Sequence, residues 1–115
     1  MPKRTDAELA QDSRDSILRI ETYVAGLNFD AFFADEMARD AVVRNLEIIG
    51  EASKNLSSSF RKKFEEAEWR EAAGMRDRLI HHYASVNWEI VWHVVTVELP
   101  KLKVALKPSS KNGGK

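Results

Sequence analysis

Apolar residues recur at intervals of three and four positions in several separate stretches of this sequence. In the first stretch they are Leu9, Ile17, Ile20, Val24 and Leu27. This spacing places side chains on one face of an α-helix, whereas a strand would show strict alternation. No strand of useful length is found. The chain is therefore predicted to be all-α, an antiparallel bundle of four to five helices.

Capping residues and helix breakers predict where the first two helices begin and end. Thr5 and Glu8 have the spacing of a capping box, so the first helix is expected to begin there. The stretch around Gly26 interrupts its pattern. A second helix is predicted over 34–57, followed by a short surface helix or loop over 57–68. The buried face of the second helix is expected to comprise Met37, Val42, Leu46 and Ile49.

Two further helices are predicted in the second half of the chain. The third helix is predicted to begin near Trp69, and its apolar pattern ends around residues 83–85. Asn87 is a good N-cap for the fourth, and Pro100 is predicted to kink that helix or to end its regular part. The face of the fourth helix that packs on the core is expected to comprise Trp88, Val91, Val95, Leu99 and Leu102.

The length of 115 residues suits one domain with a single core. Residues 1–106 are predicted to form this helical domain. Residues 107–115 are small, polar and basic, and they are predicted to be a disordered tail. No apolar run approaches the roughly 20 residues that span a bilayer, and the start lacks the pattern of a signal peptide. A membrane location is not expected.

Charge and cysteine content exclude several kinds of function. The 18 basic and 18 acidic residues cancel, so any contact with nucleic acid must be local rather than driven by net charge. The absence of cysteine excludes a disulfide, a thiolate nucleophile and a thiolate metal site. A cytoplasmic location is expected.

The stretch "GMRDRLIHHYASVNWEIVW", residues 74–92, concentrates groups that suit phosphodiester chemistry. A histidine such as His81 can accept a proton in one step and return it in the next. An arginine such as Arg76 offers fixed donors and a permanent charge to a phosphate oxygen that gains charge in the transition state. RNA carries its own nucleophile, the 2′-hydroxyl, so this chemistry requires no metal ion or other cofactor.

Helix geometry leaves the choice of arginine open. Arg76 and His81 lie about 140° apart around an ideal helix, whereas Asp77 shares a face with His81 and could orient its imidazole. Arg78 is closer to His81 than Arg76 is on local geometry. The alternative is that all these groups simply cap and solvate a helix end, with Tyr83 packed beside them.

Two other pairs of polar residues favour structural roles. Glu89 and His93 have the spacing of a metal pair, but no further ligand stands at a suitable interval, so a surface role is preferred. Glu47 and Glu51 share a helix face and are flanked by basic residues, which is typical of a solvated, charge-balanced surface.

Three ordered segments resemble the HEPN superfamily, and in particular the HepT toxins of the HepT/MntA toxin–antitoxin systems. They are "RNLEIIGEASKNLS", "WREAAGMRDRLIHHY" and "VNWEIVWHVVTVELPKL". The family motif R-x4-H-x-Y corresponds here to Arg76, His81 and Tyr83. Asp77 stands where the family often has asparagine, and it brings a negative charge near the phosphate. The resemblance extends from the first predicted helix to Leu102.

This resemblance implies a metal-independent ribonuclease with Arg76 and His81 as catalytic residues and Asp77 in support. It also implies a symmetric homodimer, or a higher even oligomer, in which the motifs of two subunits meet in a cleft. The implied partner is an MntA-like nucleotidyltransferase antitoxin that transfers AMP to Tyr83 and so excludes RNA. The alternative is a non-catalytic HEPN protein that only binds such a nucleotidyltransferase.

Overall fold

The computed structural model describes residues 4–62 and 86–106, and every regular element in these two ranges is helical. The all-α prediction is confirmed. The predicted third helix and the predicted tail over 107–115 lie outside the described residues. In chain order the elements are α1 (Asp6–Val24), α2 (Phe29–Ala34), α3 (Glu36–Asn55), α4 (Ser58–Lys62), α6 (Trp88–His93), the π-helical turn η2 (Val94–Glu98) and α7 (Leu99–Ala105).

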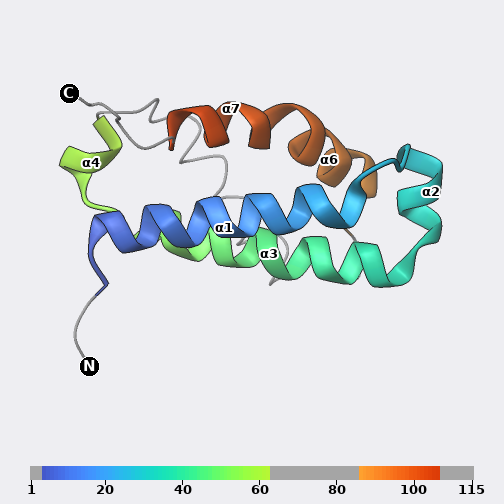
Figure 1. Cartoon of the computed structure of the whole chain (residues 1–115), viewed down its shortest axis with the longest axis horizontal. Coiled ribbons are helices and arrows are strands. Elements are labelled where there is room, and N and C mark those ends of the chain that lie inside the picture. Colours follow the sequence, from blue (N-terminus) through green and yellow to red (C-terminus); the bar gives the residue numbers. More distant parts are fainter. Residues whose placement is uncertain (1–3, 63–85, 107–115) are drawn as a thin grey trace.

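The helices α1 and α3 lie side by side and antiparallel, with α2 at one end and α4 at the other (Figure 1). The carboxylate of Asp6, at the start of α1, accepts hydrogen bonds from the backbone N–H and the hydroxyl of Ser57, at 3.0 and 2.6 Å. Since Ser57 follows α3, these bonds join the beginning of one helix to the end of the other.

The α6–η2–α7 segment packs along α1 in the opposite direction (Figure 1). Arg14 Nη1 donates to the carbonyl oxygen of Leu106 at 2.7 Å. About two helical turns further along α1, Glu21 pairs with Lys103 Nζ at 3.0 Å. Later residues of α1 thus meet earlier residues of α7, as the antiparallel prediction requires.

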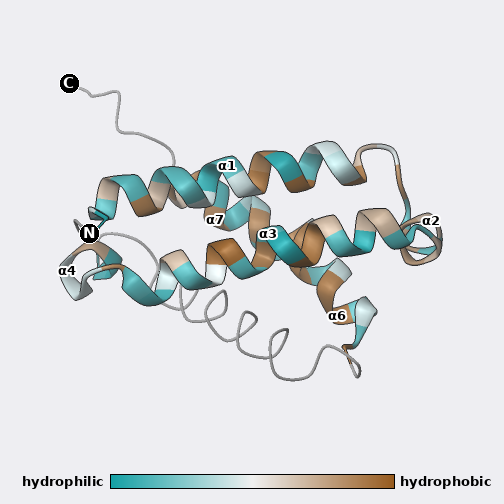
Figure 2. Cartoon of the chain, turned by 90° about the horizontal axis from the view of Figure 1, so that it is seen from below, coloured by the Kyte–Doolittle hydropathy of each residue, from teal (hydrophilic) through white to brown (hydrophobic). Residues whose placement is uncertain are grey.

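The core lies where α1, α3 and the α6–η2–α7 segment face each other. Each of these helices carries both hydrophobic and hydrophilic residues, which is typical of helices with one buried and one exposed face (Figure 2). All four of the residues predicted to be buried between Val91 and Leu102 are buried, and Trp88 packs partly buried against them. The largest fully buried side chains are Phe32, Ile17, Ile20, Ile49, Val42 and Val91.

The predicted start and end of the first helix are confirmed. Thr5 Oγ1 accepts from the Glu8 N–H at 3.1 Å, and the Glu8 carboxylate accepts from the Thr5 N–H at 2.9 Å. These two bonds complete the capping box. After α1, Gly26 has a φ of 79°, a left-handed conformation that favours glycine and turns the chain toward α2.

The prediction for Met37 was wrong. Its side chain is 83% exposed, whereas Val42, Leu46 and Ile49 are buried as predicted. Five residues separate Met37 from Val42, which corresponds to about 140° around a helix, so the two cannot share a face. Ala38 occupies the buried position in the first turn of α3 instead.

The fourth predicted helix begins at its predicted cap and loses regularity before Pro100. Asn87 Oδ1 accepts from the N–H groups of Glu89 and Ile90, at 3.0 and 3.3 Å. At the end of η2 the Leu99 N–H donates to the carbonyl oxygen of Val94, five residues earlier. Pro100 has no N–H, and its ring would clash with the carbonyl four residues earlier in a regular α-helix. The wider π-helical turn η2 includes this carbonyl, four residues before Pro100, and so avoids the clash.

Within the two described ranges, no helix combines the length and the apolar character needed to cross a bilayer.

Candidate functional site

The predicted catalytic residues Arg76 and His81 lie outside the described residues, as do Asp77 and Tyr83. Covalent connection still ties them to a described part of the molecule, because Tyr83 precedes Val86 by three residues. Three extended residues span about 11 Å at most, and the five residues from His81 to Val86 span about 18 Å. The surroundings of Val86 are thus the nearest described surface to the motif along the chain.

An aromatic cluster joins α2 to α6 beside Val86. The Phe32 ring is fully buried and stacks on Trp92 with 4.9 Å between ring centroids, while Trp88 meets it edge-on at 6.1 Å. Phe29 meets Trp92 at 6.4 Å and Phe33 at 5.9 Å. Aromatic pairs in these arrangements stabilise packing beyond the area they bury. The cluster therefore fixes the position of α6 relative to α2.

Arg39 of α3 packs against two rings of this cluster. The carbon of its guanidinium lies 5.3 Å from the centroid of Phe33 and 5.2 Å from that of Trp88. Both distances are within the range of cation–π attraction. The Nε atom of Arg39 is buried and makes no hydrogen bond. A positive charge is thereby held against two aromatic rings.

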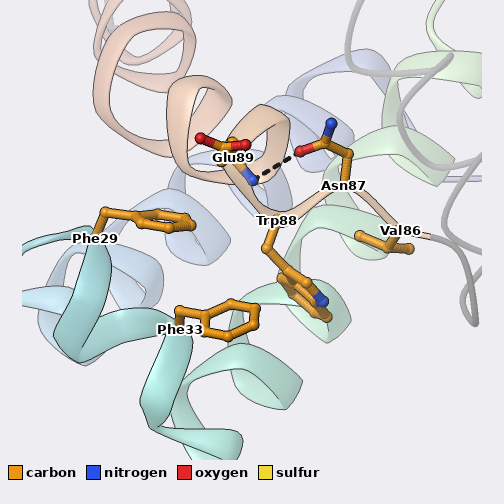
Figure 3. Close-up of a pocket in the computed structure, with 6 residues that line it drawn as sticks. All are labelled: Phe29, Phe33, Val86, Asn87, Trp88 and Glu89. Atoms are coloured by element: carbon orange, nitrogen blue, oxygen red, sulfur yellow. Dashed lines mark hydrogen bonds between the residues drawn. The ribbon is translucent and has the colours of Figure 1, made fainter.

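A cavity of about 540 Å³ opens between α2 and the beginning of α6 (Figure 3). Three aromatic rings line it, and the polar side chains of Asn87 and Glu89 stand on the α6 side of its mouth. Arg39 is not among the residues that line the cavity. The residues that line the cavity are Phe29, Phe33, Val86, Asn87, Trp88 and Glu89.

The polar groups at the mouth offer both a donor and an acceptor. The Oδ1 atom of Asn87 is occupied by the cap of α6, and within the described part of the chain its Nδ2 group makes no hydrogen bond. The Glu89 carboxylate likewise has no side-chain partner there. A planar ligand with polar edges would fit this combination of aromatic wall and mixed polar rim.

Neither this cavity nor helix α2 was predicted from the sequence. The signal was present in "NFDAFFA", residues 28–34, where an Asn that can cap a helix precedes three phenylalanines at positions i, i+3 and i+4. Asn28 Oδ1 indeed accepts from the Ala31 N–H at 2.9 Å. The segment is only six residues long, which makes its helical periodicity difficult to detect.

The candidate metal pair takes a different partner in the structure. His93 Nε2 lies 3.5 Å from Glu98 Oε1, across the π-helical turn. Among the residues that the structure describes, no three His, Asp or Glu side chains form a group that could hold a metal ion.

Comparison with known proteins assigns the chain to a family. The family model described as "Ribonuclease HepT-like" matches residues 14–108, which include the complete R-x4-H-x-Y motif. A protein named "Probable ribonuclease HepT" from Thermococcus cleftensis is 41% identical over 101 residues, which are 88% of this chain and 92% of that protein.

Two other relatives carry the name "Putative RNase". The one from Caldanaerobacter subterraneus subsp. tengcongensis is 48% identical over 84 residues, 73% of this chain and 75% of that protein. The one from Methanocaldococcus jannaschii is 38% identical over 100 residues, 87% of this chain and 83% of that protein. No solved structure matches the sequence. The helical architecture and the match over most of the chain confirm the resemblance seen in the sequence, and the protein belongs to the HepT-like ribonuclease family.

Proposed function

We propose that this protein is a metal-independent endoribonuclease of the cytoplasm, with Arg76 and His81 as its catalytic residues. The observation that carries this proposal is the family match over 14–108, which includes both residues at the spacing of the family motif. The names of the relatives support ribonuclease activity. The chemistry of the two side chains supplies the mechanism.

In the proposed reaction His81 removes the proton from a 2′-hydroxyl of the RNA. The resulting oxygen attacks the adjacent phosphorus, and the bond from phosphorus to the 5′-oxygen of the next nucleotide breaks. That 5′-oxygen leaves with a proton that the His81 imidazolium returns, so the protons balance over the reaction. Arg76 stabilises the charge that develops on the phosphate oxygens. Asp77 orients the imidazole and raises its pKa in this proposal.

The proposed active unit is a symmetric dimer. On a single helix Arg76 and His81 would point about 140° apart. In a two-fold assembly the arginine of one subunit can approach the histidine of the other, so the motif becomes productive in a cleft between subunits.

Cleavage assays on purified protein test the site directly. His81→Ala and Arg76→Ala are each expected to lower the cleavage rate by about 10²- to 10⁴-fold, while EDTA leaves the wild-type rate unchanged. Arg78→Ala is the matched control, because it removes an equal charge from the neighbouring arginine. Cleavage that survives both the His81 and Arg76 substitutions would contradict the assignment.

We further propose that the protein is the toxin of a toxin–antitoxin pair and is neutralised when an MntA-like nucleotidyltransferase transfers AMP to Tyr83. An added nucleotide brings negative charge and bulk to a phosphate-binding cleft, which repels RNA and fills its space. The place of Tyr83 in the R-x4-H-x-Y motif supports this proposal.

The intact mass of protein co-expressed with its nucleotidyltransferase tests the modification. An increase by the mass of one or more AMP groups is expected, and it is lost in Tyr83→Phe. The chain contains only one other tyrosine, Tyr23, which is 41% exposed on α1, so Tyr23→Phe is the control and retains the increase. Loss of the mass increase in Tyr23→Phe would assign the modification to Tyr23 and contradict the proposal for Tyr83.

The rival is a non-catalytic partner of a nucleotidyltransferase. The neutral net charge is compatible with that role. It would be favoured if expression of the chain alone left cells growing normally and purified protein left RNA intact.

A further inference from the structure

We propose that the cavity between α2 and α6 binds a base of the RNA substrate, packed against Phe33 between Phe29 and Trp88. This inference rests on the proposed ribonuclease function and adds a substrate subsite to it. The cavity and the side chains that form it appear in Figure 3.

The aromatic wall provides the affinity. Single-stranded RNA is commonly held by bases that pack on aromatic rings, because every base has a flat face. Phe33 is 49% exposed, so ring surface is available to a ligand. The Phe33 ring also contacts the Phe29 ring, at 5.9 Å between centroids, and the guanidinium carbon of Arg39, at 5.3 Å from its centroid, and these contacts hold it in place.

The charge balance of the protein favours a base over a phosphate in the cavity. The chain has no net charge, so phosphate attraction over the whole surface is weak and local contacts must supply binding. The Glu89 carboxylate at the mouth would repel a phosphate, but it can accept a hydrogen bond from an exocyclic amino group. Adenine, cytosine and guanine carry such a group and uracil does not.

The location fits an RNA strand that reaches the proposed catalytic residues. Val86 lines the cavity and follows His81 by five residues, so the two Cα atoms are at most about 18 Å apart. A base in the cavity would therefore belong to a nucleotide close to the phosphate that is cut.

Binding of short single-stranded RNA to His81→Ala protein tests the inference without cleavage. Adding Phe33→Ala is expected to weaken binding of oligoadenylate and oligocytidylate by about 5- to 100-fold. Phe33→Tyr retains the ring and should retain binding. Leu18→Ala is the matched control, because Leu18 is equally exposed, at 48%, but lies on α1 outside the cavity. Equal affinity of the Phe33→Ala and Leu18→Ala proteins would overturn the inference.

A second substitution tests the polar rim. His81→Ala protein is expected to bind oligoadenylate and oligocytidylate more tightly than oligouridylate, and adding Glu89→Gln should reduce this preference. The same preference in Glu89→Gln protein would remove Glu89 from the site and contradict the proposed orientation of the base.

Three outcomes separate this inference from the proposed function and from a contact between protein copies. If wild-type protein binds RNA through Phe33 but never cleaves it, the subsite stands and the ribonuclease proposal fails; if it cleaves RNA and Phe33→Ala changes neither binding nor rate, only the subsite fails. Sedimentation gives the third result. A change in assembly mass on Phe33→Ala would show that the cavity is a contact between copies, and the inference would be wrong.

Discussion

Two adjacent phenylalanines of α2 face opposite environments. Phe32 is fully buried among Trp88 and Trp92, whereas Phe33 is half-exposed at the cavity. Consecutive positions on a helix differ by about 100°, so one ring reaches the core and the other stays at the surface. The same residue type therefore stabilises the fold at one position and offers a binding surface at the next.

Truncation of the two rings should separate these roles. Phe32→Ala is expected to lower the free energy of unfolding by about 3–5 kcal/mol, because it leaves a cavity in the core. Phe33→Ala should cost less, about 1 kcal/mol, since a half-exposed ring and its contacts with Phe29 and Arg39 are lost. Urea unfolding of the two variants measures both values. Similar losses at the two positions would contradict the burial that distinguishes them.

The charge of Glu8 makes the stability of the folded protein depend on pH. The Thr5 backbone N–H donates to its carboxylate and holds the pKa of Glu8 below its ordinary value. A lowered pKa in the folded state means that the carboxylate contributes stability above its unfolded pKa of about 4.3, and that this contribution is lost as pH falls through the folded pKa. Glu8→Gln keeps the hydrogen bond of the capping box but removes the charge.

Wild-type protein should therefore be more stable than Glu8→Gln at neutral pH, and the difference should shrink as the pH falls below about 4.3. Urea unfolding of both proteins at a series of pH values measures this difference. A difference that stays constant down to the acid limit would show that the capping bond, rather than the charge, distinguishes the two.

At the scale of elements, the fourth predicted helix consists of three consecutive segments in the structure. Asn87 begins α6, the π-helical turn η2 follows, and α7 continues past Pro100 to Ala105. Because η2 lies before the proline, Leu99 and Leu102 still reach the core beyond it. The helix thus continues across a residue that would otherwise interrupt its packing.

Loss of the cap at Asn87 should weaken this segment. Asn87→Ala leaves the N–H groups of Glu89 and Ile90 without their acceptor and is expected to cost about 1 kcal/mol of unfolding free energy. Asn87→Asp keeps an acceptor at the same position and should retain most of the stability. Thermal unfolding of the two variants compares them, and equal losses would show that Oδ1 is not the stabilising group.

At the scale of the whole molecule, the proposed dimer predicts that two inactive variants recover cleavage activity when mixed, which a monomeric enzyme would not do. If Arg76 of one subunit acts with His81 of the other, a mixture of Arg76→Ala and His81→Ala proteins contains heterodimers with one complete site. After exchange of subunits at equal amounts, about a quarter of wild-type cleavage should return. Each variant alone supplies the baseline. A mixture no more active than its components would place both groups of a site in one subunit.

Much of this architecture follows from the sequence by itself, because local periodicity and capping act within a few residues. The sequence alone predicts the capping box at Thr5, the cap at Asn87, the buried face from Val91 to Leu102 and the family motif. Membership of the HepT-like family belongs to the same level, since it depends on residue types in order along the chain.

Other features were decided only by tertiary packing. The helix α2 and the cavity beside Val86 depend on how α2 meets α6, an element more than 50 residues later in the chain. A six-residue segment has too little periodicity to define a helix, but the burial of Phe32 between two tryptophans stabilises it. Helical periodicity determined the elements, and contacts between distant elements decided which aromatic surface was left exposed.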